Sequence, residues 1–156
     1  MNRQQALAQV MSLCIKFEGV YLRPYLCPAG VPTIGVGSTR YLDGTTVRLT
    51  DPPITRDHAL VLLREKVLRE YMPAVEAMCR VRTEADLAAL TDFAYNLGVG
   101  NLRASTLRRR VNAGRWDLVE VELMKWVRGG GRVLKGLVVR RRAEASLMAS
   151  TDVQSR

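Results

Sequence analysis

Apolar residues recur at steps of three and four along much of the chain, which is the pattern of one buried face of an α-helix. In residues 3–17 this stripe runs through Val10 and Cys14 to Phe17, and Gly19 is a typical helix stop. The same periodicity predicts further helices over residues 55–72, 83–97, 105–112, 116–127 and 136–149.

The ends of two of these helices carry their own signals. Thr55 and Thr83 are residues that cap helix N-termini, and Thr83 with Asp86 approximates a capping box. Pro73 should kink or restart the second helix, which otherwise runs towards Cys79, because proline has no backbone N–H to donate.

Between Val20 and Arg48 the pattern changes to short apolar runs separated by glycines and prolines. Such runs, at residues 21–22, 31–36 and 45–49, are typical of a small antiparallel sheet. Residues 28–30 and 42–44 have the composition of its tight turns.

These elements predict an α+β fold in a single domain over residues 1–156. We expect a β lobe over residues 19–54, a connecting helix over 55–72, and a larger helical lobe made of residues 1–18 and 72–150. The cleft between the two lobes is the expected place for a ligand.

The composition and charge narrow the class of protein. Apolar residues make up 47% and charged residues 25%, which excludes a disordered chain. No apolar run approaches the roughly 20 residues of a membrane helix, and we expect a mature chain made in the cytosol. The three cysteines fit neither a disulfide framework nor a zinc site, so Cys14 and Cys79 are interpreted as buried apolar residues, and neither metal nor cofactor is expected.

The net charge of +9 is concentrated in residues 103–142, while the remainder of the chain sums to zero. An anionic partner is therefore expected: nucleic acid, an anionic membrane surface or an anionic wall polymer. No nucleic-acid-binding motif is visible, so nucleic-acid affinity is interpreted as incidental. The arginine runs at residues 108–110 and 140–142 either meet envelope anions or form a solvated basic face.

Glu18 stands out because it continues the apolar stripe of the first helix at its last turn. Apolar neighbours and the helix C-terminus both disfavour a charged carboxyl there. A protonated glutamate is what a general acid needs. The alternatives are a solvent-exposed glutamate or one paired with a nearby arginine.

Glu18 is followed by Cys27 nine residues later and by Thr33 after six more, and Thr33 opens a Thr-Ile-Gly-Val-Gly turn. In this spacing the chain resembles the phage-type lysozymes, the endolysins of glycoside hydrolase family 24. Further segments match in order: residues 54–59, 95–100, 105–107, 112–114, 136–137 and 140–142.

This resemblance implies a lysozyme-like fold and a peptidoglycan-hydrolysing enzyme. Glu18 would be the general acid, while Cys27 and Thr33 would handle the attacking water, with inversion at the sugar. Cys27 could orient water, act as a partly ionised base or be a nucleophile, and the sequence does not choose among these roles.

The resemblance also implies substrate contacts from Tyr95, Asn96, Thr39 and Thr106. The alternative for the first two is structural: Tyr95 would pack in the core and Asn96 would cap a helix. Trp116 and Trp126 lie on helical stripes and are expected in the core. His58, the one histidine, is expected to be an exposed first-turn residue.

The implied reaction is cleavage of the β-1,4 bond between N-acetylmuramic acid and N-acetylglucosamine, which lyses the bacterium and releases phage. A lytic transglycosylase is the second enzymatic interpretation, because it also uses an acid glutamate. We expect a monomer that accumulates in the host cytoplasm and reaches the wall from the periplasmic side through the pore of a separate holin.

Overall fold

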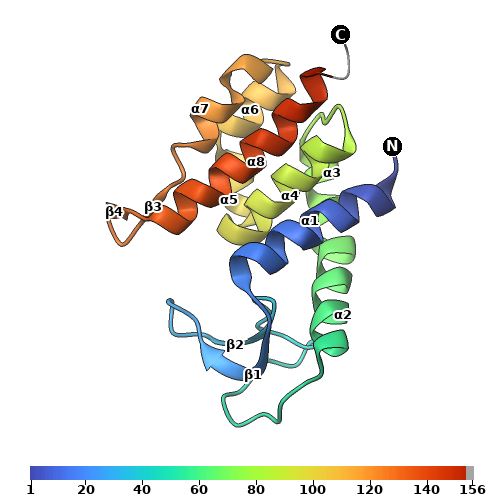
Figure 1. Ribbon diagram of the computed structural model, residues 1–156, viewed down its shortest axis with the longest axis vertical. Coiled ribbons are helices and arrows are strands. Elements are labelled where there is room, and N and C mark those ends of the chain that lie inside the picture. Colours follow the sequence, from blue (N-terminus) through green and yellow to red (C-terminus); the bar gives the residue numbers. More distant parts are fainter. Residues whose placement is uncertain (154–156) are drawn as a thin grey trace.

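The computed structural model describes the backbone of residues 1–153 and the side chains of residues 1–150. It is a mixed α+β structure, mostly helical, with the small two-stranded sheet set below the helices in Figure 1. In chain order the helical elements are α1 (Arg3–Glu18), α2 (Arg56–Lys66), α3 (Met72–Met78), α4 (Glu84–Leu97), α5 (Val99–Ala104), α6 (Thr106–Asn112), α7 (Val119–Leu123) and α8 (Lys135–Val153).

Helix α4 is the centre of the helical part, with α1 and α8 packed against it. Every residue from Ala85 to Ala94 is buried, so this helix has no solvent face over that stretch. It begins at the predicted cap, where the Thr83 hydroxyl accepts from the backbone N–H of Asp86, and it ends at Gly98. The positions around α4 therefore hold the principal core.

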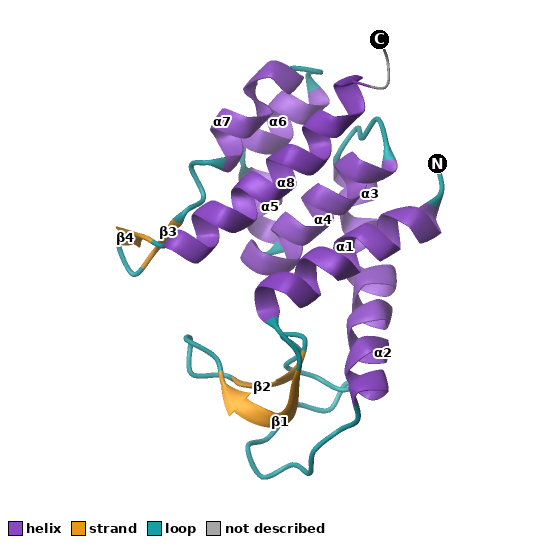
Figure 2. Cartoon of the chain, viewed as in Figure 1, coloured by secondary structure: helices purple, strands orange, loops and turns teal. Residues whose placement is uncertain are grey.

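The sheet pairs β1 (Tyr21–Leu26) with β2 (Pro32–Gly35) in antiparallel register, with Tyr25 opposite Thr33. Figure 2 shows how short these strands are beside the loops around them. The predicted turns at residues 28–30 and 42–44 are present. The expected third strand at residues 45–49 is wrong, because only a single bridge between Arg40 and Thr46 forms there.

The helix that leaves the β lobe is interrupted at the position that its proline predicted. Thr55 caps α2 through its hydroxyl, and a π-helical turn at Val67–Tyr71 follows before α3 begins. Pro73 occupies the first turn of α3, where its missing N–H costs no hydrogen bond. The wider π turn absorbs the break that a proline inside a continuous helix would cause.

One prediction for the second half of the chain needs correction. The helix expected over residues 116–127 is only a 3₁₀ turn at Trp116–Leu118 followed by the short α7. The glycine run after α7 turns a hairpin that was not predicted, β3 (Arg128–Gly129) with β4 (Arg132–Val133). Gly130 and Gly131 both have positive φ, which is what a two-residue type I′ turn requires.

Within residues 1–153, the structure has no helix that is both long enough and apolar enough to cross a membrane. All three cysteines carry free thiols, and Cys14 and Cys79 are buried as expected.

Candidate active site

Glu18 is the last residue of α1, and the chain turns away immediately after it. Gly19 adopts φ of 75° and its N–H closes the helix on the Ile15 carbonyl at 3.0 Å. The Glu18 side chain is 25% exposed, so it is neither fully buried nor open to bulk water. Its Oε2 lies 3.5 Å from the place where a side-chain carbon on Gly37 would be, which brings the loop after β2 against the carboxylate.

Arg140 of α8 is the charged partner of Glu18. Its Nη1 donates to Glu18 Oε1 at 2.7 Å, and its own side chain is only 4% exposed. The surroundings of Glu18 therefore differ from the purely apolar ones expected, and they match the alternative in which an arginine pairs with it.

The Arg140 guanidinium also binds Asp92 of α4. Arg140 Nε and Nη2 donate to the two Asp92 oxygens at 2.9 and 2.8 Å, a bidentate pair. Burial disfavours the charged form of Arg140, but Asp92 and Glu18 outweigh it and raise the pKa of the guanidinium. Burial also acts against the Asp92 carboxylate, yet its hydrogen bonds from Arg140 lower the pKa of that carboxyl.

Cys14 contributes to this cluster as well. Its thiol donates to Asp92 at 3.5 Å, and burial raises the pKa of the thiol well above its ordinary value. The side chain is thus buried as predicted, but it also completes the hydrogen bonds of a buried carboxylate.

A second buried pair lies one position further along α8. Arg141 donates to Glu144 at 2.8 Å and to the Asn96 side-chain oxygen at 2.8 Å. Burial, reinforced by the Asp92 charge, raises the pKa of Glu144 well above its ordinary value. The buried cluster thus sets two guanidinium groups, those of Arg140 and Arg141, against the carboxyl groups of Glu18, Asp92 and Glu144.

The two arginines also correct one interpretation of the basic runs. Arg140 and Arg141 are buried and paired with acids, so neither belongs to a solvated face or reaches envelope anions. Within the run at 108–110, Arg108 donates to the backbone carbonyls of Met78 and Arg103.

A groove of about 380 Å³ opens in front of Glu18. Among the described residues, Glu18, Asn96 and Arg140 supply its polar lining. Its remaining lining residues are Phe17 of α1, Leu134 just before α8, and Gly136 and Leu137 of α8. The structure thus brings Glu18 and Asn96 to one groove.

Cys27 and Thr33 form the other half of the candidate site, at the β1–β2 hairpin. Cys27 is half-exposed at the start of the turn, and Thr33 is buried on β2 with its hydroxyl donating to the Val31 carbonyl at 2.8 Å. The backbone N–H of Val31 lowers the pKa of the Cys27 thiol; burial opposes it, and the Ala29 N–H and the Thr33 hydroxyl add to the lowering. Neither residue lines the Glu18 groove itself.

Tyr25 links the two halves, and sequence reasoning did not single it out. Burial raises the pKa of its phenol, and the charges of Glu18 and Cys27 add to the effect, so its hydroxyl lies within electrostatic reach of both. Its place two residues before Cys27 was the available signal, because alternate residues of an extended strand share a face.

The other predicted substrate contacts are placed less directly. The Tyr95 hydroxyl donates to the Val36 carbonyl and its ring packs on Tyr71, so it joins α4 to the loop after β2. Thr106 begins α6, where its hydroxyl accepts from Arg109 at 2.8 Å, and Thr39 is half-buried beyond β2. Of the described residues that line the Glu18 groove, none is Tyr95, Thr39 or Thr106.

Arg140 and Asp92 are the functional residues that the sequence analysis missed. Arg140 was interpreted as part of a basic run and of a matching segment, without a role of its own. Asp92 had a usable signal, because it is an acid within a helical segment otherwise rich in alanine and leucine. Within the described part of the chain, no group of three acidic, cysteine or histidine side chains is placed to hold a metal ion.

Comparison with known proteins gives one consistent result. The defining sequence pattern of the phage lysozyme family matches residues 15–144. The endolysin of Bacillus phage B103 is 34% identical over 143 residues, covering 91% of this chain but 53% of that protein. The SAR-endolysin of Haemophilus phage HP1 (strain HP1c1) is 30% identical, covering 94% of this chain and 82% of its own length.

The fold agrees with the sequence comparison. The solved structure of the endolysin from Escherichia coli O157:H7 phage FAHEc1 superposes with a TM-score of 0.82 at 30% identity, covering 92% of both chains. The present chain thus spans about half the length of the Bacillus phage protein and most of the other two. Since the family pattern covers most of its residues, the chain belongs to the phage lysozyme family.

Proposed function

We propose that the chain is a peptidoglycan-hydrolysing endolysin, a muramidase that cleaves the β-1,4 bond between N-acetylmuramic acid and N-acetylglucosamine. The observation that carries this proposal is a glutamate held at the edge of a groove by a buried arginine. Family membership and the names of the relatives, which are endolysins, support it.

Glu18 is the general acid in this proposal. Arg140 occupies only Oε1, so Oε2 can carry the proton that the bridging oxygen of the sugar chain receives. Asp92 balances the charge of Arg140, so the guanidinium orients the carboxyl while its own charge is compensated. Asn96, fixed by Arg141, lines the same groove and offers an amide to an N-acetyl group.

Cys27 and Thr33 handle the attacking water in this proposal. The backbone N–H groups of Val31 and Ala29 favour the thiolate form of Cys27, and this thiolate can accept a proton from the attacking water. The Thr33 oxygen, whose hydrogen is directed to Val31, can accept from the same water. Attack on the face opposite to the leaving group gives inversion, with no covalent intermediate.

The substitution Glu18→Gln tests the acid. Glutamine keeps the shape and an oxygen for Arg140 but has no acidic proton, so wall hydrolysis should fall by about 10²–10⁴-fold. The measurement is mass spectrometry of digested peptidoglycan for both proteins, with thermal unfolding of the variant as a folding control. A reducing N-acetylmuramic acid end supports hydrolysis. A 1,6-anhydro end shows a transglycosylase, and full activity of the variant removes Glu18 from the reaction.

Three narrower statements stay predictions. They are action as a monomer, release through the pore of a separate holin, and the route from host cytoplasm to the periplasmic face of the wall.

A further inference from the structure

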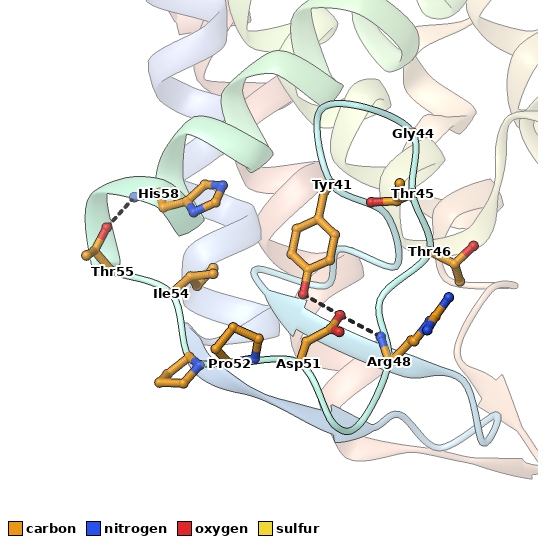
Figure 3. A pocket seen from close by; sticks show the side chains of 11 residues that line it. Tyr41, Gly44, Thr45, Thr46, Arg48, Asp51, Pro52, Ile54, Thr55 and His58 are labelled. Carbon is orange, nitrogen blue, oxygen red and sulfur yellow. Dashed lines mark hydrogen bonds between the residues drawn. The ribbon is translucent and has the colours of Figure 1, made fainter.

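A second hollow, of about 790 Å³, lies in the β lobe and shares none of the described residues that line the Glu18 groove. It is formed by the loop between β2 and α2 together with the first turn of α2. In Figure 3, Tyr41 stands in its middle, with Thr46 and Arg48 on one side and Ile54 and His58 on the other.

The walls of this hollow are fixed by their own hydrogen bonds. Asp51 accepts from the Tyr41 hydroxyl at 2.8 Å and from the backbone N–H of Arg48 at 2.8 Å, as Figure 3 shows. The Ile54 N–H donates to the Leu22 carbonyl of β1 at 2.8 Å, which anchors the far end of the loop to the sheet. The hollow therefore exists before any ligand arrives, so little ordering cost attaches to binding.

Tyr41 supplies an aromatic surface at the centre of the hollow. Its ring packs on the small apolar cluster of the β lobe, formed by Ile34, Val47 and Leu62. Burial and the bond to Asp51 raise the pKa of its phenol to about 12, so the hydroxyl stays a donor to that carboxylate. The ring therefore has a fixed orientation.

The rim of the hollow supplies polar groups of two kinds. Thr45 and Thr46 are exposed. The Thr45 hydroxyl donates to Asp43 at 2.6 Å, so its oxygen is left to accept, while the Thr46 hydroxyl can donate or accept. Arg48 and His58 are exposed at the rim, and a guanidinium is the side chain best suited to hold a carboxylate. Asp51 is occupied by its two donors, whose hydrogen bonds lower the pKa of its carboxyl.

We propose that this hollow is a second, non-catalytic binding site for a carboxylate-bearing sugar segment of the cell-wall polymer. A sugar ring on Tyr41, hydroxyl groups on the threonines and a carboxylate on Arg48 would use the lining on one side of the hollow, and His58 faces them from the other side. The inference rests on the proposed function for the identity of the polymer. A polymer engaged at two places on one molecule is bound more tightly than at either place alone.

His58 makes the site directly observable, because it is the one histidine of the chain and its imidazole gives a single set of NMR signals. The experiment uses the full chain with Glu18→Gln, so that the probe is not cleaved, at fixed pH. Three probes are titrated: a soluble peptidoglycan fragment that carries stem peptides, a neutral N-acetylglucosamine oligomer, and inorganic phosphate.

We expect the peptidoglycan fragment to shift the His58 signals to saturation, and Arg48→Ala to weaken that binding about tenfold, the effect of one charge-assisted hydrogen bond. Arg56→Ala, which removes the same charge from an exposed residue outside the lining, should change it less than twofold. Unmoved His58 signals, equal losses in both variants, or equal shifts with phosphate or the neutral oligomer each overturn the proposal. Failure of the proposed function shows separately, as wild-type protein that does not cleave the wall.

Discussion

At the scale of single residues, the candidate site depends on how two side chains are surrounded. Glu18 is held by a cation, and Cys27 is held by backbone N–H groups. The sequence could place both residues by their spacing. It could not supply their electrostatic surroundings, because Arg140 is 122 positions away from Glu18 along the chain.

Substitutions at Cys27 separate its possible roles. Cys27→Ser removes the ionisable thiol, and we expect wall hydrolysis to fall by about 10²-fold or more. Cys27→Asp restores a base with a lower pKa, so activity should return and the rise of rate with pH should move to lower pH. The measurement is the pH–rate profile of all three proteins on purified peptidoglycan.

Cys79→Ser is the matched control, because that cysteine is buried in the principal core. Its rate at each pH should follow the wild type, whatever it does to stability. If Cys27→Ser keeps the wild-type profile, the thiol handles no proton in the reaction.

At the scale of elements, helices α4 and α8 are joined by charges as well as by apolar packing. Asp92 and Glu144 lie fully buried on the two helices, with Arg140 and Arg141 between them. The periodicity of the sequence predicted both helices correctly. It interpreted residues 140–142 as surface, because a run of arginines is usually exposed and only a partner from another helix reverses that.

Glu144→Gln should make stability depend less on pH. In the folded protein the pKa of Glu144 lies well above its ordinary value of 4.5, so above that pH the folded state holds a proton that the unfolded state has lost. Wild-type stability therefore falls as pH rises, by up to about 1.4 kcal/mol per pH unit from this group. From pH 4.5 upward, the free energy of unfolding of the variant, measured with urea, should rise relative to that of the wild type. If the two free energies change in parallel with pH, Glu144 is ionised in the fold.

Asp92→Asn, in the same buried cluster, should lower the stability of the fold, whereas Glu144→Gln should raise it above pH 4.5. It leaves Arg140 without its full counter-charge, and removing one partner of a buried ion pair costs about 3–5 kcal/mol. Ionisation of Glu144 can recover part of this loss, because it places a negative charge beside Arg141 and within electrostatic reach of Arg140. The double variant Asp92→Asn/Glu144→Gln should therefore be less stable than the sum of the two changes, as measured by a double-mutant cycle. Simple additivity would contradict the shared charge balance.

At the scale of the whole molecule, the fold class was predictable and the extent of the sheet was not. A stripe of period three to four is local information, so the long helices follow from it. Residues 45–49 had a strand-like composition, but they find no long partner and form loop walls instead. The β3–β4 hairpin was hidden because glycines mark stops and tight turns alike.

The excess positive charge of the second half of the chain lies partly on the β3–β4 hairpin. Of the cations in residues 103–142, Arg140 and Arg141 are buried beside acidic side chains, while Arg128, Arg132 and Lys135 stay exposed on or beside the β3–β4 hairpin. Leu134, which follows that hairpin, lines the Glu18 groove, so these charges lie near the expected path of an anionic polymer.

Binding of Glu18→Gln protein to purified wall should therefore weaken with salt, because the Debye length falls from about 30 Å at about 0.01 M to about 3 Å at about 1 M. Replacing Arg128 and Arg132 by glutamine should weaken binding at low salt and leave it nearly unchanged at high salt, as measured by sedimentation with wall fragments. Arg64→Gln/Arg69→Gln on the α2 side removes the same charge and should have a smaller effect. If both double variants lose affinity equally, net charge rather than the placement of the hairpin draws the polymer to this protein.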